Sequence, residues 1–371
     1  MKKAILLVLL FAFSSFSYAV SIDKNLLNKA KSGDRVSQEE VAKFYEFSGE
    51  EGESLSWLYT AFENGSGYAA GKIAKAYYEG SMGLKRDRYE AWSWYRKGAN
   101  LSDRDSLLFM SNDYWERGSS TNQKIAFQHL VQCISELKDS ECNVRYAKLR
   151  RSVSGNLDTS ALEAVQRAEK MGYPEAYTEL AFYYENGYIV EKDISKAYSY
   201  LQKAASKNEK NALEKIGEAY LHAHKYGLNK DEKKGVDALE KAGVLGNGAA
   251  YRTLGDYYFA DKKNTINLNK AINYYQKGVA LDNPYAAWNL ASLYSEYSDN
   301  LGRRQSSYWK EMAKLMTLAA DAGLLTAQLE LASSYNKGEM GLSSRSKAKY
   351  YYELAAKQGS GEAKLKLKGF N

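Results

Sequence analysis

Few residues of this 371-residue chain have types and spacings that suit chemistry. His222 and His224 are two apart, so a helix would place them on different faces, and no Asp, Glu or Cys completes a metal set. His129 takes a large-residue position in its helix, which favours a core or half-buried role over catalysis. Nucleophile-elbow, H-E-x-x-H, phosphate-loop and dinucleotide motifs are absent from the sequence. We therefore expect no catalytic residue, metal or cofactor, although a carboxylate pair acting on a glycoside stays open.

The chain has two cysteines, Cys133 and Cys142. Cys133 comes near the end of one predicted helix and Cys142 begins the next, where another part of the chain carries Ala204 and Ala212. We expect those positions to touch across the turn, and in an exported chain such a pair should oxidise to a disulfide. Two buried free thiols are the alternative.

The first nineteen residues are typical of an export signal. Lys2 and Lys3 precede the apolar run AILLVLLFAF, and Ser17-Tyr18-Ala19 fits a small-x-small cleavage site. We expect cleavage near Ala19, a mature chain from about Val20, and a periplasmic or secreted protein. An uncleaved anchor is the less favoured alternative. Later apolar runs are shorter than eighteen residues, so the mature chain should contain no membrane span.

The formal net charge is +7, of which Lys2 and Lys3 contribute two, leaving +5 after cleavage. Acidic and basic residues alternate through most of the chain, without the continuous basic stripe that tracks phosphates. The charge pattern therefore argues against nucleic acid as a partner.

Two helical patterns alternate along the chain. The first, small-x3-apolar-small-x2-Tyr, occurs at 176–184 and 327–335 and defines one helix face. The second, small-x2-large-large-x2-small-small, occurs at 197–205 and 348–356. Successive starts of the second pattern are 37, 35, 35, 36, 38, 36, 41 and 36 residues apart. One helix pair cannot bury its apolar stripe alone, whereas stacked pairs can, so the sequence predicts an all-α solenoid of antiparallel helix pairs.

Particular residues mark the predicted helix ends. Glycines occur where first helices must stop, because glycine adopts the left-handed capping conformation without strain; they are Gly80, Gly187 and Gly338. Aspartates that can cap free backbone amides precede the second helices; they are Asp87, Asp193 and Asp231.

The combined pattern A-x3-LA-x2-Y-x2-G … D-x2-KA-x2-Y-x3-AA resembles the Sel1-like repeat, a relative of the tetratricopeptide repeat. The resemblance extends over about 37–370 and is strong at 69–101, 173–207, 247–281 and 326–358. It implies a right-handed α-solenoid of about nine helix pairs with a C-terminal capping helix, forming a single domain over 20–371. The poorly matching insertion at 299–310 is interpreted as a protruding loop.

Members of this family are generally non-enzymatic adaptors, and exported bacterial members work in the periplasm or outside the cell. The resemblance therefore implies a protein partner, held in a concave groove lined by the first helix of each pair. Among the inward-facing positions of the repeat, ten are candidate binding residues: Tyr78, Trp115, Phe182, Glu214, Glu218, Arg252, Asp256, Phe259, Tyr285 and Trp288. Aromatic anchors ringed by polar groups are typical of protein-binding surfaces. Burial between repeats is the alternative for any one of these aromatics.

Two other functions stay open. The chain could be an immunity or inhibitor protein that neutralises a periplasm-acting toxin or enzyme, because a solenoid can wrap a large surface. It could also be a glycan-binding module, in which Trp115 and Trp288 stack on sugar rings.

Overall fold

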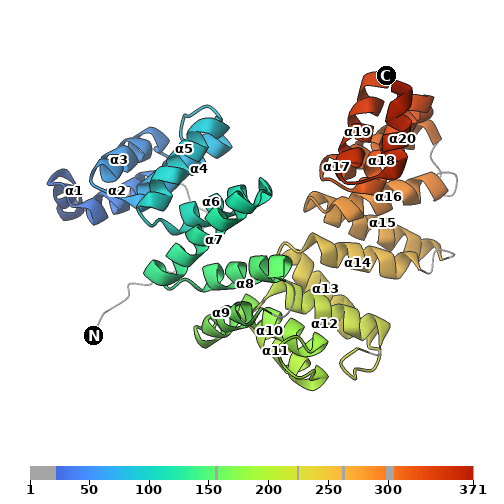
Figure 1. Cartoon of the computed structure of the whole chain (residues 1–371), viewed down its shortest axis with the longest axis horizontal. Helices are drawn as coiled ribbons and strands as arrows, with labels where there is room; N and C mark the ends of the chain where they lie inside the picture. The colour runs from blue at the N-terminus through green and yellow to red at the C-terminus, as the bar shows by residue number, and fades with distance from the viewer. Residues whose placement is uncertain (1–21, 155–157, 224, 261–263, 298–304, 371) are drawn as a thin grey trace, which may run out of the picture. The chain divides into compact units, whose positions relative to one another are not determined.

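The computed structural model describes residues 22–154, 158–223, 225–260, 264–297 and 305–370. The predicted export signal at 1–19 lies outside these residues. Every regular element in the described part of the chain is a helix (Figure 1). The all-α solenoid class is thus confirmed. None of the described helices is long and apolar enough to cross a membrane.

The chain forms two compact units, and the boundary between them in the sequence falls within helix α8 (Ser140–Ser154). Of the described residues, those up to 146 belong to unit 1 and those from 147 onward belong to unit 2. Before α8, unit 1 contains α1 (Lys24–Lys31), α2 (Arg35–Phe47), α3 (Glu51–Glu63), α4 (Gly67–Glu79), α5 (Arg88–Asn100), α6 (Arg104–Glu116), α7 (Ser120–Gln132) and the π-helix η1 (Cys133–Leu137).

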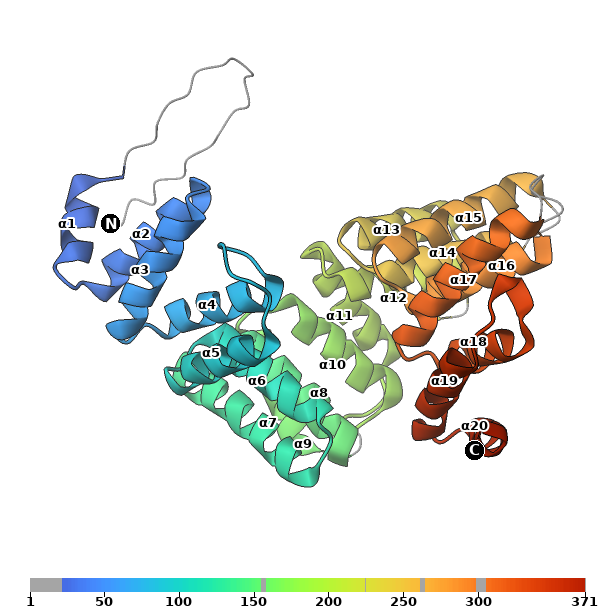
Figure 2. The same cartoon turned by 90° about the horizontal axis from the view of Figure 1, so that it is seen from above.

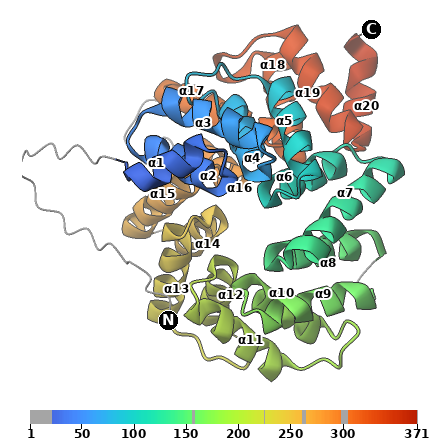
Figure 3. The ribbon, with the colours of Figure 1, turned by 90° about the vertical axis from the view of Figure 1, so that its left-hand side faces the viewer.

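Unit 2 continues the same pairing of helices, as Figure 2 shows. After α8 it contains α9 (Thr159–Lys170), α10 (Pro174–Asn186), α11 (Ile194–Ser206), α12 (Lys210–His222), α13 (Glu232–Val244), α14 (Gly248–Phe259), α15 (Thr265–Ala280), α16 (Pro284–Tyr297), α17 (Gln305–Asp321), α18 (Leu325–Lys337), η2 (Glu339–Gly341), α19 (Arg345–Lys357), α20 (Gly361–Leu367) and η3 (Lys368–Phe370). At the C-terminal end of unit 2, helix α19 packs against both α18 and α20 (Figure 3).

The small residues of the two patterns lie where helices cross. Ala176, Ala197, Ala327 and Ala348 are all 0% exposed, and α10 packs on α11 as α18 packs on α19. A methyl group at these positions lets two backbones approach while leaving room for larger neighbours. Each fully buried leucine beside them, such as Leu201, contributes roughly 1.5–3 kcal/mol.

Tyrosines fill the space beside the alanines. Tyr335 stacks on Tyr351 with ring centroids 6.1 Å apart, and Tyr258 stacks on Tyr274 at 5.7 Å. Each of these two pairs joins the first helix to the second helix of one repeat, and all four tyrosines are buried in the core.

The predicted helix ends are confirmed. First helices end at glycines with left-handed φ angles, namely Gly80 (74°), Gly187 (72°) and Gly338 (78°). Second helices follow aspartates whose carboxylates accept backbone N–H bonds, namely Asp87, Asp193 and Asp231.

Cys133 and Cys142 form a disulfide with a Cα–Cα distance of 6.2 Å, as expected. It joins the π-helical end of the α7 segment to the beginning of α8 within unit 1. In the chain-entropy account, closing a loop of this length stabilises the fold by about 2–3 kcal/mol.

Two features differ from the sequence-based expectations. The loop interpretation of 299–310 is wrong for 305–310, which are helical, whereas 299–304 lie outside the described residues. The helix extends this far because it has an apolar stripe of buried side chains at i, i+4 and i+7, namely Tyr308, Met312 and Leu315.

The second difference is helix α1, which precedes the predicted first repeat. Its Ala30 is buried, and the Ala30 backbone carbonyl accepts a hydrogen bond from the side-chain amide of Gln38.

Close helix contact can be tested at Gly255 in α14. A Cβ added there would lie 2.4 Å from two ring carbons of Tyr275, which is 2% exposed. The energetic cost of overpacking should exceed the gain of about 1 kcal/mol in helix propensity. We therefore expect Gly255→Ala to lower the free energy of unfolding by about 1–2 kcal/mol. Gly361→Ala, with open space around it, should leave the melting temperature unchanged or slightly higher. Equal melting curves for both variants would contradict this packing.

Candidate partner-binding surface

Within each unit the first helices of successive pairs approach one another. Helix α4 approaches α6 in unit 1, and α10, α12, α14 and α16 do so in turn in unit 2. Among the described residues, the second helices α11, α13 and α15 do not approach one another to the same degree. Elements on the inner side of a curved stack lie closer together than those on its outer side. The first helices therefore form the inner side of each unit.

All ten predicted binding residues lie on these inner helices, but they differ in exposure. Tyr78 on α4 and Tyr285 on α16 are 38% and 53% exposed. The other eight are partly buried: Trp115, Phe182, Glu214, Glu218, Arg252, Asp256, Phe259 and Trp288. Phe259 and Trp288 both pack against the core of unit 2, so the alternative of burial between repeats stays open for them. A role of these residues in partner binding stays a prediction.

Phe182 on α10 lies beneath a cation. The Arg151 guanidinium carbon is 4.1 Å from the Phe182 ring centroid, and Nη1 of Arg151 donates to a Glu179 carboxylate oxygen at 2.6 Å. A cation over an aromatic ring is attracted by the negative face of the ring. This contact holds the Arg151 guanidinium of α8 against the Phe182 ring of α10.

Glu214 and Glu218 link α12 to α14. The side-chain amide nitrogen of Asn247 donates to a Glu214 carboxylate oxygen at 2.8 Å. The side-chain oxygen of Asn247 accepts backbone N–H bonds at the N-terminus of α14. The Thr253 hydroxyl donates to Glu218 at 3.3 Å. Burial raises the pKa of the Glu214 carboxyl, with a smaller contribution from the charge of Glu218 and an opposing one from the Asn247 hydrogen bond. These carboxylates therefore hold neighbouring inner helices in register.

The Asp256 carboxylate on α14 accepts hydrogen bonds from three side chains. Its carboxylate accepts bonds from Arg252 at 2.5 Å, from the Tyr275 hydroxyl at 2.7 Å and from the Asn289 amide at 2.7 Å. Burial and the neighbouring Asp256 charge raise the pKa of the Tyr275 hydroxyl, so it stays protonated and donates. The predicted charged residues are thus largely engaged within the protein, which fixes the surface they form.

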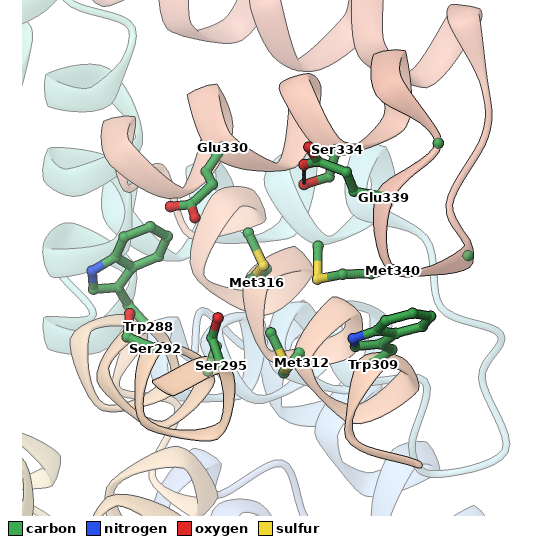
Figure 4. A pocket seen from close by; sticks show the side chains of 13 residues that line it. Trp288, Ser292, Ser295, Trp309, Met312, Met316, Glu330, Ser334, Glu339 and Met340 are labelled. Atoms are coloured by element: carbon green, nitrogen blue, oxygen red, sulfur yellow. Dashed lines mark hydrogen bonds between the residues drawn. The ribbon is translucent and has the colours of Figure 1, made fainter. Parts of the chain in front are cut away.

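A pocket of about 420 Å³ lies beside Trp288 in unit 2 (Figure 4). Trp288 on α16 and Trp309 on α17 lie at its two ends, with Met312, Met316 and Met340 between them. Met312 and Met316 are buried, whereas Trp309 is 37% exposed. The pocket therefore has an apolar, sulfur-rich floor with an accessible aromatic ring.

The opposite wall of this pocket is acidic. Glu330 on α18 points toward the Trp288 end, and Glu339 follows the left-handed Gly338. Reduced hydration raises the pKa of the Glu330 carboxyl, and the charge of Glu339 raises it further. The Glu339 carboxylate lies 3.5 Å from Lys337 Nζ, whereas no hydrogen bond or ion pair joins Glu330 to another described residue.

Sequence reasoning identified Trp288 but missed the rest of this pocket. One signal was available: Met312 occupies a position where most other repeats have alanine, serine or glycine. A long, flexible side chain at a small-residue position indicates a gap that the repeat itself does not fill.

In unit 1, Tyr78 borders a second pocket of about 710 Å³ between α4, α5 and α6. Tyr78 meets Phe109 edge-on at 6.0 Å, and the indole N–H of Trp92 donates to Asp113 at 2.9 Å. Arg117 pairs with the same aspartate at 2.7 Å. Trp115 lies elsewhere, edge-on to Phe127 at 5.9 Å, and is not among the residues that line this pocket.

Of the other groups considered for chemistry, His129 has a packing role. His129 is half-buried, stacks on Tyr114 at 5.9 Å and has its pKa lowered by burial, as expected for a packed histidine. His222 is exposed and His224 lies outside the described residues. Among the described side chains, Cys133, Asp139 and Cys142 form the one cluster with metal-ligand geometry, and both of its sulfurs are in the disulfide.

Comparison with known proteins identifies the repeat. The Sel1 repeat family matches residues 67–103, 174–209, 249–283 and 325–360. These four segments are Sel1 repeats. They coincide closely with the strong parts of the pattern in the sequence, and each one contains a first helix and a second helix.

Relatives of known sequence or structure were also found. The chain is 26% identical over 216 residues to chitin synthase regulatory factor 3 of Schizosaccharomyces pombe, a match spanning 57% of this chain and 23% of that protein. A protective antigen of uropathogenic Escherichia coli strains, which displays an SLR fold, is 18% identical with a TM-score of 0.50, over 94% of this chain and 82% of that one. Yeast Tom70 is 14% identical with a TM-score of 0.50, over 87% of this chain and 66% of that one. These structural likenesses show the fold.

The raised pKa of Glu214 predicts a pH-dependent effect of substitution. At pH values between the ordinary pKa of a glutamate and the raised pKa of Glu214, the folded protein keeps a proton that the unfolded chain releases. The contribution of Glu214 to the free energy of unfolding therefore becomes more favourable as the pH falls. We expect Glu214→Gln to match or exceed the parent melting temperature at pH 7.5, with the difference shrinking toward pH 5. Glu163→Gln, at an exposed position on α9, is the control. A Glu214→Gln protein that melts lower than the parent at every pH would contradict the assignment.

Proposed function

We propose that this Sel1-repeat chain is a non-enzymatic adaptor that binds a protein partner along the inner helices. After cleavage near Ala19 it would act in the periplasm or outside the cell. In this proposal residues 20–371 act as one solenoid of about nine helix pairs with a C-terminal cap. Sel1 and tetratricopeptide-like folds suggest protein–protein interaction, which supports the general class.

One observation carries the proposal: aromatic side chains stand on inner helices beside polar groups that are already hydrogen-bonded. Tyr285 is 53% exposed on α16, and Trp288 lies one turn further along the same helix. Asn289, also on α16, is held by Asp256 of α14 at 2.7 Å. A surface ordered before binding loses less conformational entropy when the partner docks. Tyrosine and tryptophan are also the residues that most often dominate interface energies.

Affinity capture with a matched pair of variants tests this proposal. Tyr285 and Tyr350 are 53% and 52% exposed, but Tyr285 lies on the first helix α16 and Tyr350 on the second helix α19. We expect the parent and Tyr350→Ala to retain one protein from the envelope fraction of the source cells. Tyr285→Ala combined with Trp288→Ala should lose it, with affinity falling at least tenfold and helicity unchanged by circular dichroism.

Equal capture of the partner by Tyr350→Ala and by the double variant would contradict binding on the inner helices. If the parent protein captures no partner, the adaptor proposal itself is contradicted. The identity of the partner separates the alternatives. A toxin or enzyme whose activity is blocked in the complex would make the chain an inhibitor or immunity protein. Direct saccharide binding that Trp115→Ala or Trp288→Ala abolishes would instead make it a glycan-binding module.

A further inference from the structure

The pocket between α16, α17 and α18 has a composition that specifies more than a generic partner. Its floor combines two tryptophans with three methionines (Figure 4). Methionine is unbranched and polarizable, so it adapts to apolar groups of different shapes. Tryptophan supplies a large, rigid surface at low entropic cost. A volume of about 420 Å³ suits one or two side chains rather than a folded surface.

The charge of the pocket differs from that of the chain. The whole chain carries a net charge of +7, yet the charged residues that line this pocket are Glu330 and Glu339, with no Lys, Arg or His among them. Lys337 Nζ lies 3.5 Å from the Glu339 carboxylate, so of these two glutamates it is Glu330 that has no ion pair with another described residue. A cation placed beside Glu330 would also lie near the Trp288 ring, whose face attracts cations.

We propose that this pocket receives a linear segment of the partner in which a large apolar side chain stands next to a lysine or arginine. The apolar side chain enters between Trp288 and Trp309 and packs on the methionines, and the neighbouring cation pairs with Glu330. This assignment rests on the adaptor function and deepens it. The exposed Trp309 ring leaves the pocket open at one end, so the segment continues onto the surface instead of being enclosed.

A random twelve-residue peptide library displayed on phage, selected on the intact mature chain, tests this assignment. We expect enriched peptides to place Leu, Phe, Met or Trp within three positions of Lys or Arg. A labelled synthetic copy of the commonest peptide is then measured by fluorescence anisotropy. Trp288→Ala should weaken its binding more than tenfold, and Glu330→Gln, which keeps the shape of the pocket, by about threefold.

Glu353→Gln, at an exposed position on α19 outside the pocket, is the charge-matched control and should bind like the parent. No enrichment, an acidic consensus, or equal binding by Trp288→Ala and Glu330→Gln would overturn the assignment. A cellular partner retained by both of these pocket variants would also overturn it while leaving the adaptor function intact. Conversely, a basic peptide that binds in the pocket when no cellular partner is captured would contradict the adaptor proposal and support only the ligand chemistry assigned to the pocket.

Discussion

The structure depends on close approach of helix backbones at small residues. Alanines with no exposed surface lie at the crossings of α10 with α11 and of α18 with α19, and Gly255 leaves no space for even a Cβ beside Tyr275. Because these contacts repeat about every 36 residues, each pair presents its first helix to the same side of its unit. The inner helices, and any surface they form, are a consequence of that spacing.

Polar residues on the inner side hold neighbouring helices together through hydrogen bonds. Glu214 holds the capping Asn247 of the next inner helix, and Asp256 joins α14 to both α15 and α16 through Tyr275 and Asn289. Such bonds give the surface a defined shape, and their carboxylates are partly satisfied within the chain. Glu330 differs because it has no such partner among the described residues, and it faces a pocket with an apolar floor.

The sequence predicted the features that depend on local chemistry or on repetition. Gly187 ends a first helix because the left-handed cap there suits glycine, and Asp193 begins the next helix as a backbone acceptor. It did not predict the pocket, because Met340 reaches it from the irregular turn after α18 and Trp309 from a helix read partly as a loop. It also missed that Asp256 bonds Tyr275, since that contact joins two different helices.

Hydrogen–deuterium exchange of the captured complex tests the central claim most directly, because it maps contact without substitutions. Partner binding should slow amide exchange in the inner helices α10, α12, α14 and α16 and leave the second helices α11, α13 and α15 unchanged. Protection confined to the second helices, or spread equally over both sets, would contradict the account that the inner helices hold the partner.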